Sequence, residues 1–207
     1  MGDAAGTLAA AVHALAALPG ARLAGVSRLY ATAPVGVTDQ PEFRNAVVAV
    51  DVPAGPDAER GATALLVALK GIERAFGRRE RERWGPRELD LDLLVFGRAR
   101  ISIDRPAAAR SLEAADDLAG TARRLEIPHR EAHERLFVLA PLADVAARLV
   151  PPGWGETIET ARRRRVEAEG TGAARPVASW DAPAGRWSEP TAGRPAASSG
   201  RTCERCR

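Results

Sequence analysis

The spacing of apolar residues predicts two helices in the first half of the chain. Residues 2–18 carry leucine and valine at helical spacing and stop at a Pro-Gly pair, which breaks helices. Residues 56–76 carry a longer apolar stripe, with proline and aspartate at its start and glycine after its end, the usual punctuation of a helix. We therefore expect two helices, of which the second is the longer.

Partial alternation of apolar and polar residues, with many β-branched side chains, predicts strands at 21–32 and 42–52. Residues 88–97 read as another strand, and residues 98–104 as a short strand after the turn at Gly97. The order helix, strand, strand, helix, strand, strand indicates an α+β sheet with helices on one face.

The rest of the chain divides at about residue 160. Residues 107–124 look like an alanine- and arginine-rich helical insertion, and residues 135–150 like a helical or mixed element. After that, glycine, proline, serine and alanine dominate and aliphatic residues are few, which is typical of disorder. The length of 207 residues suits one domain, so we expect a domain at 1–160 and a disordered low-complexity tail at 161–207.

Composition indicates a soluble globular protein. Apolar residues make up 45% of the chain and charged residues 28%, and the apolar runs are too short to span a bilayer. The N-terminus lacks a basic region, and Asp3 and His13 interrupt it, so it is a poor signal peptide and a cytoplasmic location is expected. The net charge of +3 rests almost entirely on arginine, which suits phosphate ligands or reflects codon bias.

Several common motifs are missing or weak. The sequence has no Walker A loop, nucleophile elbow, zinc-spaced His/Cys cluster or helix-turn-helix pattern. Cys203 and Cys206 form a lone Cys-x-x-Cys pair in the expected tail, which argues against a metal or redox role. The arginine run at 162–165 could bind nucleic acid or acidic surfaces, but it fits a solvated charge run better.

The segment "RWGPRELDLDLL" at 83–94 carries the candidate chemistry. In a strand its leucines share one face, while Asp90 and Asp92 share the other with their Cβ atoms roughly 7 Å apart. Such a pair suits two Mg²⁺ ions that clamp phosphate oxygens. A solvated outer face is the alternative, since nothing in the alternation itself requires a metal.

The loop before this segment favours the metal interpretation. Cationic residues outnumber acidic ones between residues 70 and 87, as a metal-bound polyphosphate would require. Arg83 and Arg87 flank a rigid Trp-Gly-Pro turn that holds them beside the segment. For the other arginines a solvated loop remains the alternative.

"RWGPRELDLDLLVFG" resembles the signature of the hydroxymethyl-dihydropterin pyrophosphokinase family, which moves diphosphate from ATP to a pterin alcohol. "SRLYATAPVGVTDQPEFRNAVV", "IERAFGR" and "IPHREAHERLFVLAPLADVA" agree in the family's order. Together they cover most of residues 2–150, outside an insertion at about 104–122. The resemblance implies a ferredoxin-like antiparallel sheet with helices packed on its faces, two Mg²⁺ ions and no covalent intermediate.

The resemblance also implies site residues. Asp90 and Asp92 would ligate both magnesium ions, and Arg78 and Arg87 would stabilise the phosphates during transfer. The pterin pocket would consist of Thr32, Val35, Phe43, Asn45 and Phe137. The ATP site would consist of Lys70, Glu73, Arg83, Trp84, Arg124, His129 and Arg135.

Physical reasoning supports part of the pterin pocket. A flat heteroaromatic ring favours an aromatic side chain on each face, and the Asn45 amide can both donate to and accept from its polar edge. By composition alone, however, Phe43 and Phe137 fit an ordinary core, and His129 could be a surface histidine.

The chain departs from the family pattern in three places. The family has a strand and a Gly-Ser-Asn turn before the first helix, whereas here Met1 falls just after that turn, so the first strand is expected to be missing. Lys70 stands where the family often has glutamine, and Glu80 where it usually has arginine. The insertion lengthens a loop near the expected ATP site.

The leading hypothesis is an ATP-dependent diphosphotransferase of folate biosynthesis that acts on 6-hydroxymethyl-7,8-dihydropterin and releases AMP. One alternative is a truncated, inactive paralogue that binds pterin or ATP, or a partner such as dihydropteroate synthase. Another is a two-metal phosphohydrolase. Neither nucleic acid nor membrane is an expected partner.

Overall fold

The computed structural model describes residues 3–33, 42–76, 89–109 and 124–189. In these ranges the α-helices are α1 (Ala4–Ala16), α2 (Ala58–Ala75), α3 (Leu136–Ala146) and α4 (Ile158–Glu169), and two short 3₁₀ helices are η1 (Ala107–Ala109) and η4 (Ala132–Glu134). The strands are β1 (Arg22–Val26), β2 (Leu29–Thr32), β3 (Phe43–Asn45), β4 (Val48–Asp51), β5 (Ile101–Asp104), β6 (Arg124–Ile127), β7 (Arg175–Asp181) and β8 (Arg186–Ser188).

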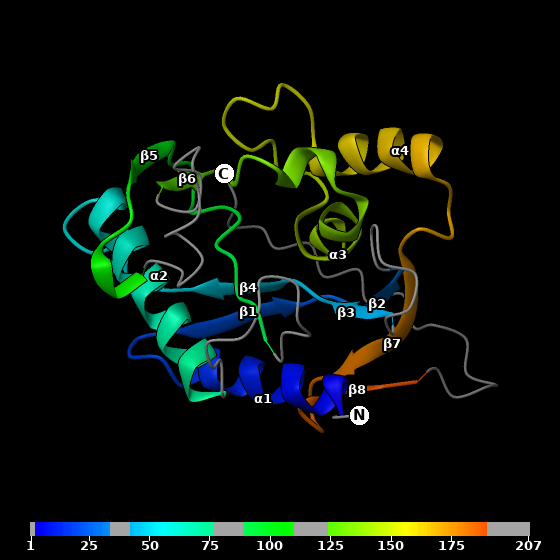
Figure 1. The fold of residues 1–207 in the computed structure, drawn as a ribbon, viewed down its shortest axis with the longest axis horizontal. Helices are drawn as coiled ribbons and strands as arrows, with labels where there is room; N and C mark the ends of the chain where they lie inside the picture. The colour runs from blue at the N-terminus through cyan, green and yellow to red at the C-terminus, as the bar shows by residue number, and fades with distance from the viewer. Residues whose placement is uncertain (1–2, 34–41, 77–88, 110–123, 190–207) are drawn as a thin grey trace.

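The described strands form antiparallel ladders. β1 pairs with β4, β5 pairs with β6, and a larger sheet has the order β3-β2-β7-β8. Helix α1 lies on one side of the β1–β4 ladder and α3 on the other, and α4 packs beside α3 (Figure 1). The fold is mixed α+β, as expected. Helices lie on both sides of the β1–β4 ladder, as the family resemblance implied, and not on one face, as the order of elements had indicated.

Both predicted helices in the first half are confirmed, and local signals explain them. Asp3 caps α1 by accepting the Gly6 N–H at 2.9 Å, and Asp57 caps α2 by accepting the Arg60 N–H at 2.8 Å. Side-chain oxygens at these positions satisfy N–H groups that have no partner in the first helical turn.

The predicted strands at 21–32 and 42–52 are each divided into two, and Ser27 lies at the first division. The Ser27 N–H donates to Val47 O at 2.9 Å, and its hydroxyl accepts the Val47 N–H at 2.9 Å. Before Ser27, β1 pairs with β4, whereas after it β2 pairs with β3 and β7. The break at Ser27 therefore divides the predicted strand between two ladders.

The predicted strand at 88–97 is wrong for the residues that the structure describes there. Residues 89–96 belong to no strand, although Leu94 O accepts the His129 N–H at 2.8 Å. The helix predicted at 107–124 is also wrong at both described ends, which are η1 and the start of β6, and its centre lies outside the described residues. The helical element predicted at 135–150 is confirmed as α3.

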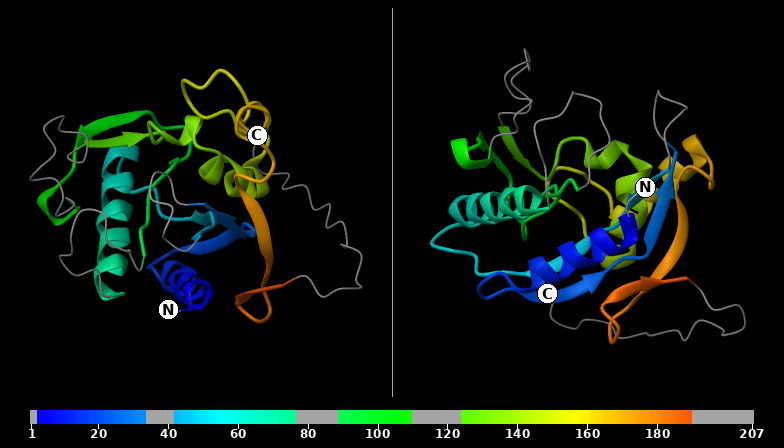
Figure 2. Two further views of the ribbon diagram at one scale, coloured as in Figure 1. Left: turned by 45° about the vertical axis from the view of Figure 1, so that its right-hand side comes forward. Right: turned by 60° about the horizontal axis from the view of Figure 1, so that its bottom comes forward.

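The prediction of disorder from residue 161 is wrong for residues 161–189, which contain most of α4 and the β7–β8 hairpin. Trp180 and Trp187 stack edge to face with 4.7 Å between ring centroids, and Trp187 Nε1 donates to Ser27 O at 2.9 Å. Two aromatic anchors thus replace the aliphatic residues that the segment lacks. Figure 2 shows the hairpin beside α1, on which β8 packs.

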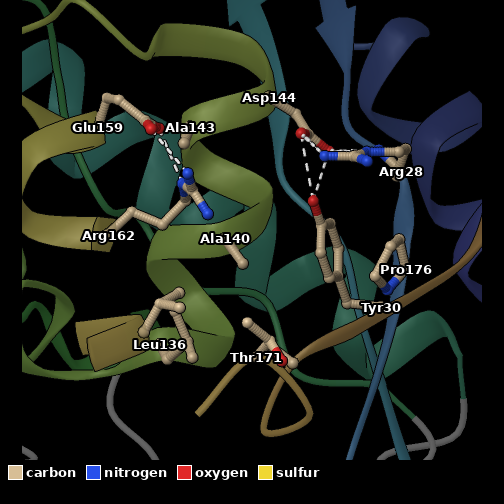
Figure 3. A pocket seen from close by; sticks show the side chains of 12 residues that line it. Arg28, Tyr30, Leu136, Ala140, Ala143, Asp144, Glu159, Arg162, Thr171 and Pro176 are labelled. Atoms are coloured by element: carbon tan, nitrogen blue, oxygen red, sulfur yellow. Dashed lines mark hydrogen bonds and ion pairs between the residues drawn. The ribbon is translucent and has the colours of Figure 1, made fainter. Parts of the chain in front are cut away.

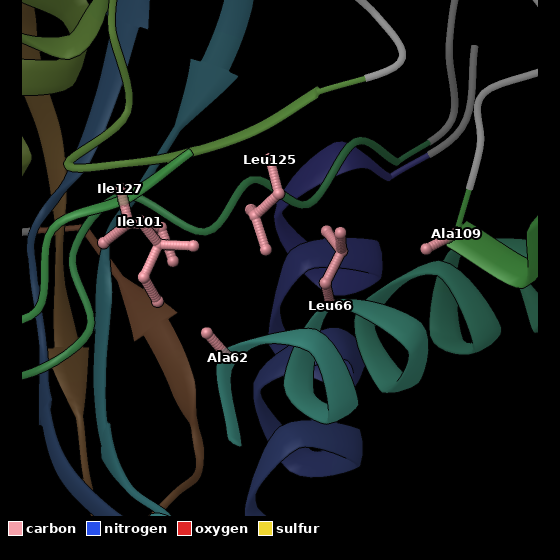
Figure 4. Packing of buried hydrophobic residues seen from close by; sticks show 6 residues of the cluster. All are labelled: Ala62, Leu66, Ile101, Ala109, Leu125 and Ile127. Atoms are coloured by element: carbon pink, nitrogen blue, oxygen red, sulfur yellow. The ribbon is translucent and has the colours of Figure 1, made fainter. Parts of the chain in front are cut away.

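Several buried clusters hold the layers together. One joins α2 to the β5–β6 ladder and is formed by Ala62, Leu66, Ile101, Ala109, Leu125 and Ile127 (Figure 4). Another joins α1 and α2 to residues 89–93. In the described ranges no helix is both long enough and apolar enough to cross a bilayer.

Candidate active site

The aspartates of the 89–94 segment face solvent, as the alternation predicted. Leu89 is buried, and it packs with Leu91 and Leu93 into the cluster between α1 and α2. Asp90 and Asp92 are exposed. The separation of leucine inside from aspartate outside is confirmed, even though the segment is not a strand.

Two charged residues of α2 lie behind this segment. Lys70 and Glu73 are only 6% and 1% exposed, and they form an ion pair with 2.7 Å between Nζ and Oε1. Glu73 Oε1 accepts the Leu91 N–H at 2.7 Å, and Lys70 Nζ donates to Leu91 O at 3.0 Å. Burial raises the pKa of the Glu73 carboxyl, while the Lys70 ammonium acts in the opposite direction.

The donor set of the segment fits magnesium. Among the described residues no group of three or more His, Cys, Asp or Glu side chains is placed to hold a metal ion, and the segment itself contributes two carboxylates. Magnesium is commonly held by one or two carboxylates, with phosphate and water oxygens completing its shell. Lys70 Nζ lies 3.8 Å from Asp90 Oδ1 and partly balances the acidic charge.

The described candidates for ATP binding other than Lys70 and Glu73 lie between the start of β6 and the start of α3. The bond from the His129 N–H to Leu94 O connects the loop after β6 to the aspartate segment. Arg124 Nη2 donates to Ser102 O at 3.0 Å. Arg135 pairs with Glu131, and its guanidinium lies 5.6 Å from the centroid of the Phe137 ring.

The described pterin candidates gather on β2, β3 and α3. Asn45 Nδ2 donates to Thr32 Oγ1 at 2.8 Å, and Thr32 lies opposite Phe43 in the ladder. Phe43 is 46% exposed, so an ordinary core role for this ring is excluded. Helix α3, which carries the half-buried Phe137, packs against both strands.

The structure thus brings together residues that are far apart in sequence, but part of the predicted site is not described. The candidates outside the described residues are Val35, Arg78, Arg83, Trp84 and Arg87.

Sequence reasoning missed a polar cavity of about 320 Å³ between β2, β7, α3 and α4 (Figure 3). Asp144 of α3 accepts hydrogen bonds from Arg28 Nη2 at 2.6 Å and from the Tyr30 hydroxyl at 3.1 Å. Burial, with help from the Asp144 charge, raises the pKa of Tyr30 to about 12. Bonding to Asp144 raises the pKa of Arg28. The network connects α3 to β2. In the sequence, its only signal is a basic residue at 28 and an acidic residue in the helix predicted at 135–150, which could form an ion pair.

The arginine run of α4 is largely paired within the fold. Arg162 bonds to Glu159 at 2.6 Å, Arg164 to Glu156 at 3.1 Å, and Arg165 to Glu169 at 2.5 Å. These contacts favour the solvated charge run over a nucleic-acid site.

Known proteins match both the sequence and the fold. Residues 1–147 match the family described as 7,8-dihydro-6-hydroxymethylpterin-pyrophosphokinase (HPPK). The chain is 40% identical over 161 residues to a 2-amino-4-hydroxy-6-hydroxymethyldihydropteridine pyrophosphokinase of Methylorubrum extorquens, covering 78% of this chain and 85% of that one. It is 40% identical over 143 residues to the enzyme of the same name from Pseudomonas aeruginosa, covering 69% and 73%.

A solved structure of Plasmodium falciparum HPPK-DHPS with pteroate resembles the fold, with a TM-score of 0.60 at 14% identity. The match covers 88% of this chain and 44% of that one, so this chain spans less than half of the larger protein. At this identity the likeness concerns the fold alone.

Proposed function

The chain belongs to the 7,8-dihydro-6-hydroxymethylpterin-pyrophosphokinase family of folate biosynthesis, and we propose that it transfers diphosphate from ATP to the hydroxymethyl group of 6-hydroxymethyl-7,8-dihydropterin. The observation that carries this proposal is the exposed pair Asp90 and Asp92 on a segment whose leucines are anchored in the core. Two carboxylates fixed in this way fit a metal-bound polyphosphate.

The reaction is a displacement at phosphorus. The pterin hydroxymethyl oxygen attacks the β-phosphorus of ATP in line, the bond from that phosphorus to the oxygen bridging the α- and β-phosphates breaks, the alcohol proton passes to water, and AMP leaves with the bridging oxygen. Because no covalent bond to the protein forms, the protein contributes positioning and charge stabilisation.

Asp90 and Asp92 would hold two Mg²⁺ ions. When bound, these ions would neutralise charge on the phosphate oxygens. Arg78 and Arg87 would stabilise charge during transfer, and the ATP contacts would come from Arg83, Trp84, Arg124, His129 and Arg135. The exposed positions of Arg124 and Arg135 in the structure support contact with a ligand.

The pterin would lie between Phe43 and Phe137, with Asn45 at its polar edge and Thr32 and Val35 lining the pocket. The exposure of Phe43 beside the Asn45–Thr32 hydrogen bond supports this site, because an exposed aromatic ring next to a fixed amide can stack on and orient a flat ligand.

We also propose that the sheet has the ferredoxin-like arrangement and that the pyrophosphokinase domain extends through β8, because β7 and β8 belong to the larger sheet. Association of this chain with a dihydropteroate synthase is a further proposal, which rests on the family resemblance. A cytoplasmic location remains a prediction.

Formation of AMP tests the proposed function. The full-length protein should produce AMP from ATP only when both the pterin alcohol and Mg²⁺ are present. A folded protein that produces no pterin-dependent AMP would refute the proposal and favour the inactive paralogue. Hydrolysis of ATP at the same rate without pterin would favour the phosphohydrolase.

A further inference from the structure

Lys70 and Glu73 lie one turn apart on α2, and both reach the same residue, Leu91. Each backbone residue has one N–H donor and one carbonyl acceptor, and at Leu91 Glu73 takes the first and Lys70 the second. The two side chains also bond to each other. A buried ion pair on the helix therefore holds both polar backbone groups of Leu91.

The side chain of Leu91 adds a third point of attachment. It packs in the cluster that contains Leu69 and Ile72 of the same helix. Leu91 lies between Asp90 and Asp92, so the peptide units on its two sides determine the directions in which both carboxylates leave the backbone. A residue fixed at three points thereby fixes its two acidic neighbours.

The ion pair also supplies the backbone hydrogen bonds that a neighbouring strand would otherwise supply. In the part of the chain that the structure describes, residues 89–96 belong to no ladder, yet Leu91 is half-buried and its polar groups need partners. Lys70 and Glu73 supply these partners from a helix. This arrangement explains why two charged side chains are buried on α2.

We propose that Lys70 and Glu73 are positioning residues that hold Asp90 and Asp92 in the geometry required for the metal-bound phosphates. This inference rests on the proposed function, because the roles of Asp90 and Asp92 come from it. It replaces the predicted contact of Lys70 and Glu73 with ATP. The exposed fractions of 6% and 1% leave little surface for a nucleotide, and such a contact would compete with the bonds to Leu91.

Amide hydrogen exchange at Leu91 in the ligand-free protein tests the positioning directly. Lys70→Met removes the donor to Leu91 O and the ion pair with Glu73, and the Leu91 N–H should exchange about fivefold to tenfold faster. Arg74→Met is the matched control, since Arg74 is a cation of the same helix that donates to another backbone carbonyl, Ala108 O, at 3.0 Å. It should leave exchange at Leu91 unchanged. Equal exchange in wild type and a folded Lys70→Met would overturn the proposal.

Steady-state kinetics separates positioning from contact with ATP. Lys70→Met should lower kcat about tenfold to a hundredfold, with KM for ATP close to that of the wild type. Lys70→Gln should restore part of kcat, because its amide can still donate to Leu91 O. A rise in KM for ATP that is equal in both variants, with kcat unchanged, would instead indicate direct contact.

If Lys70→Met does not fold, Lys70→Gln and Glu73→Gln test the ion pair instead, because each substituted amide can still bond to Leu91 while one charge of the pair is lost. Exchange at Leu91 should then be faster than in the wild type, and unchanged exchange in both variants would overturn the proposal. If the wild-type protein makes no pterin-dependent AMP, the proposed function fails, whereas exchange at Leu91 still reports whether the ion pair fixes this residue.

Discussion

Arg175 of β7 donates to Glu42 across the strand that separates them, with 2.9 Å between Nη2 and Oε1. In the register of the sheet Arg175 lies opposite Ala31 of β2, and Ala31 lies opposite Arg44 of β3. Glu42 also pairs with Arg44 at 3.4 Å. The carboxylate therefore connects β7 to the start of β3, next to the exposed Phe43.

Removing the Arg175 side chain should affect KM for the pterin more than KM for ATP. We expect Arg175→Ala to raise KM for the pterin by less than about fivefold and to leave kcat nearly unchanged, because exposed ion pairs contribute little. Arg22→Ala is the matched control, as Arg22 forms an exposed pair with Asp51 between β1 and β4. If both variants change KM for the pterin equally, the cause is a general loss of order in the sheet, and the ion pair between Arg175 and Glu42 has no specific role.

Asp92→Asn should separate activity from folding. The carboxylate is exposed, so the free energy of unfolding should change by no more than about 0.5 kcal/mol. Loss of the anionic ligand should lower the rate of AMP formation at least about a hundredfold. Asp57→Asn keeps a good helix cap and should retain wild-type activity. A fully active Asp92→Asn would remove this residue from the site.

Tyr30 is the single tyrosine of the chain, so an absorbance titration of tyrosinate at alkaline pH measures the ionisation of this residue alone. The midpoint should lie at about 12 in the folded protein and near about 10 in denaturant. Asp144→Asn should lower the folded midpoint, since the Asp144 charge disfavours tyrosinate. Identical folded and denatured midpoints would contradict the buried position of the ring.

The raised pKa of Tyr30 also predicts how the stability of the protein changes with pH. The pKa of Tyr30 is raised on folding, so its contribution to stability is complete below the unfolded pKa and is lost as the pH rises through the folded pKa. Between about pH 10 and 12 the wild-type protein should lose stability. Urea unfolding should show a weaker loss in Tyr30→Phe over this range.

Trp187 should be essential for docking of the C-terminal hairpin. Trp187→Ala removes a buried ring and the donor to Ser27 O, and should lower the free energy of unfolding by about 3 to 5 kcal/mol. Arg186→Ala changes an exposed neighbour on the same strand and should have little effect in the same denaturation experiment. Equal stability of the two variants would mean that the hairpin contributes little to the fold.

The sequence pattern predicted those features of the fold that depend on neighbouring residues, such as helix caps and the burial of single side chains. The caps at Asp3 and Asp57 and the apolar stripes behind them place α1 and α2. The alternation around Leu91 predicted which side chains face solvent, because burial of leucine is decided residue by residue. It could not predict that a helix, and not a strand, would bond to the backbone of Leu91.

Contacts between distant segments could not be predicted from composition. The segment after residue 161 has few aliphatic residues, yet Trp187 reaches Ser27 and Arg175 reaches Glu42. The sequence of that segment shows the tryptophans but not their partners. The same holds for Asp144, whose pairing with Arg28 and Tyr30 depends on how α3 crosses β2.

The position of β2 between β3 and β7 has a consequence for how the protein folds during synthesis. β3 follows β2 closely in the chain, whereas β7 lies more than a hundred residues later. Because the ribosome delivers the N-terminal part first, β2 emerges long before one of its two neighbours, and that edge stays open while the intervening residues are made. Pairings of such high contact order form slowly. The strand that carries Thr32 therefore gains its second described neighbour only after the C-terminal hairpin has been made.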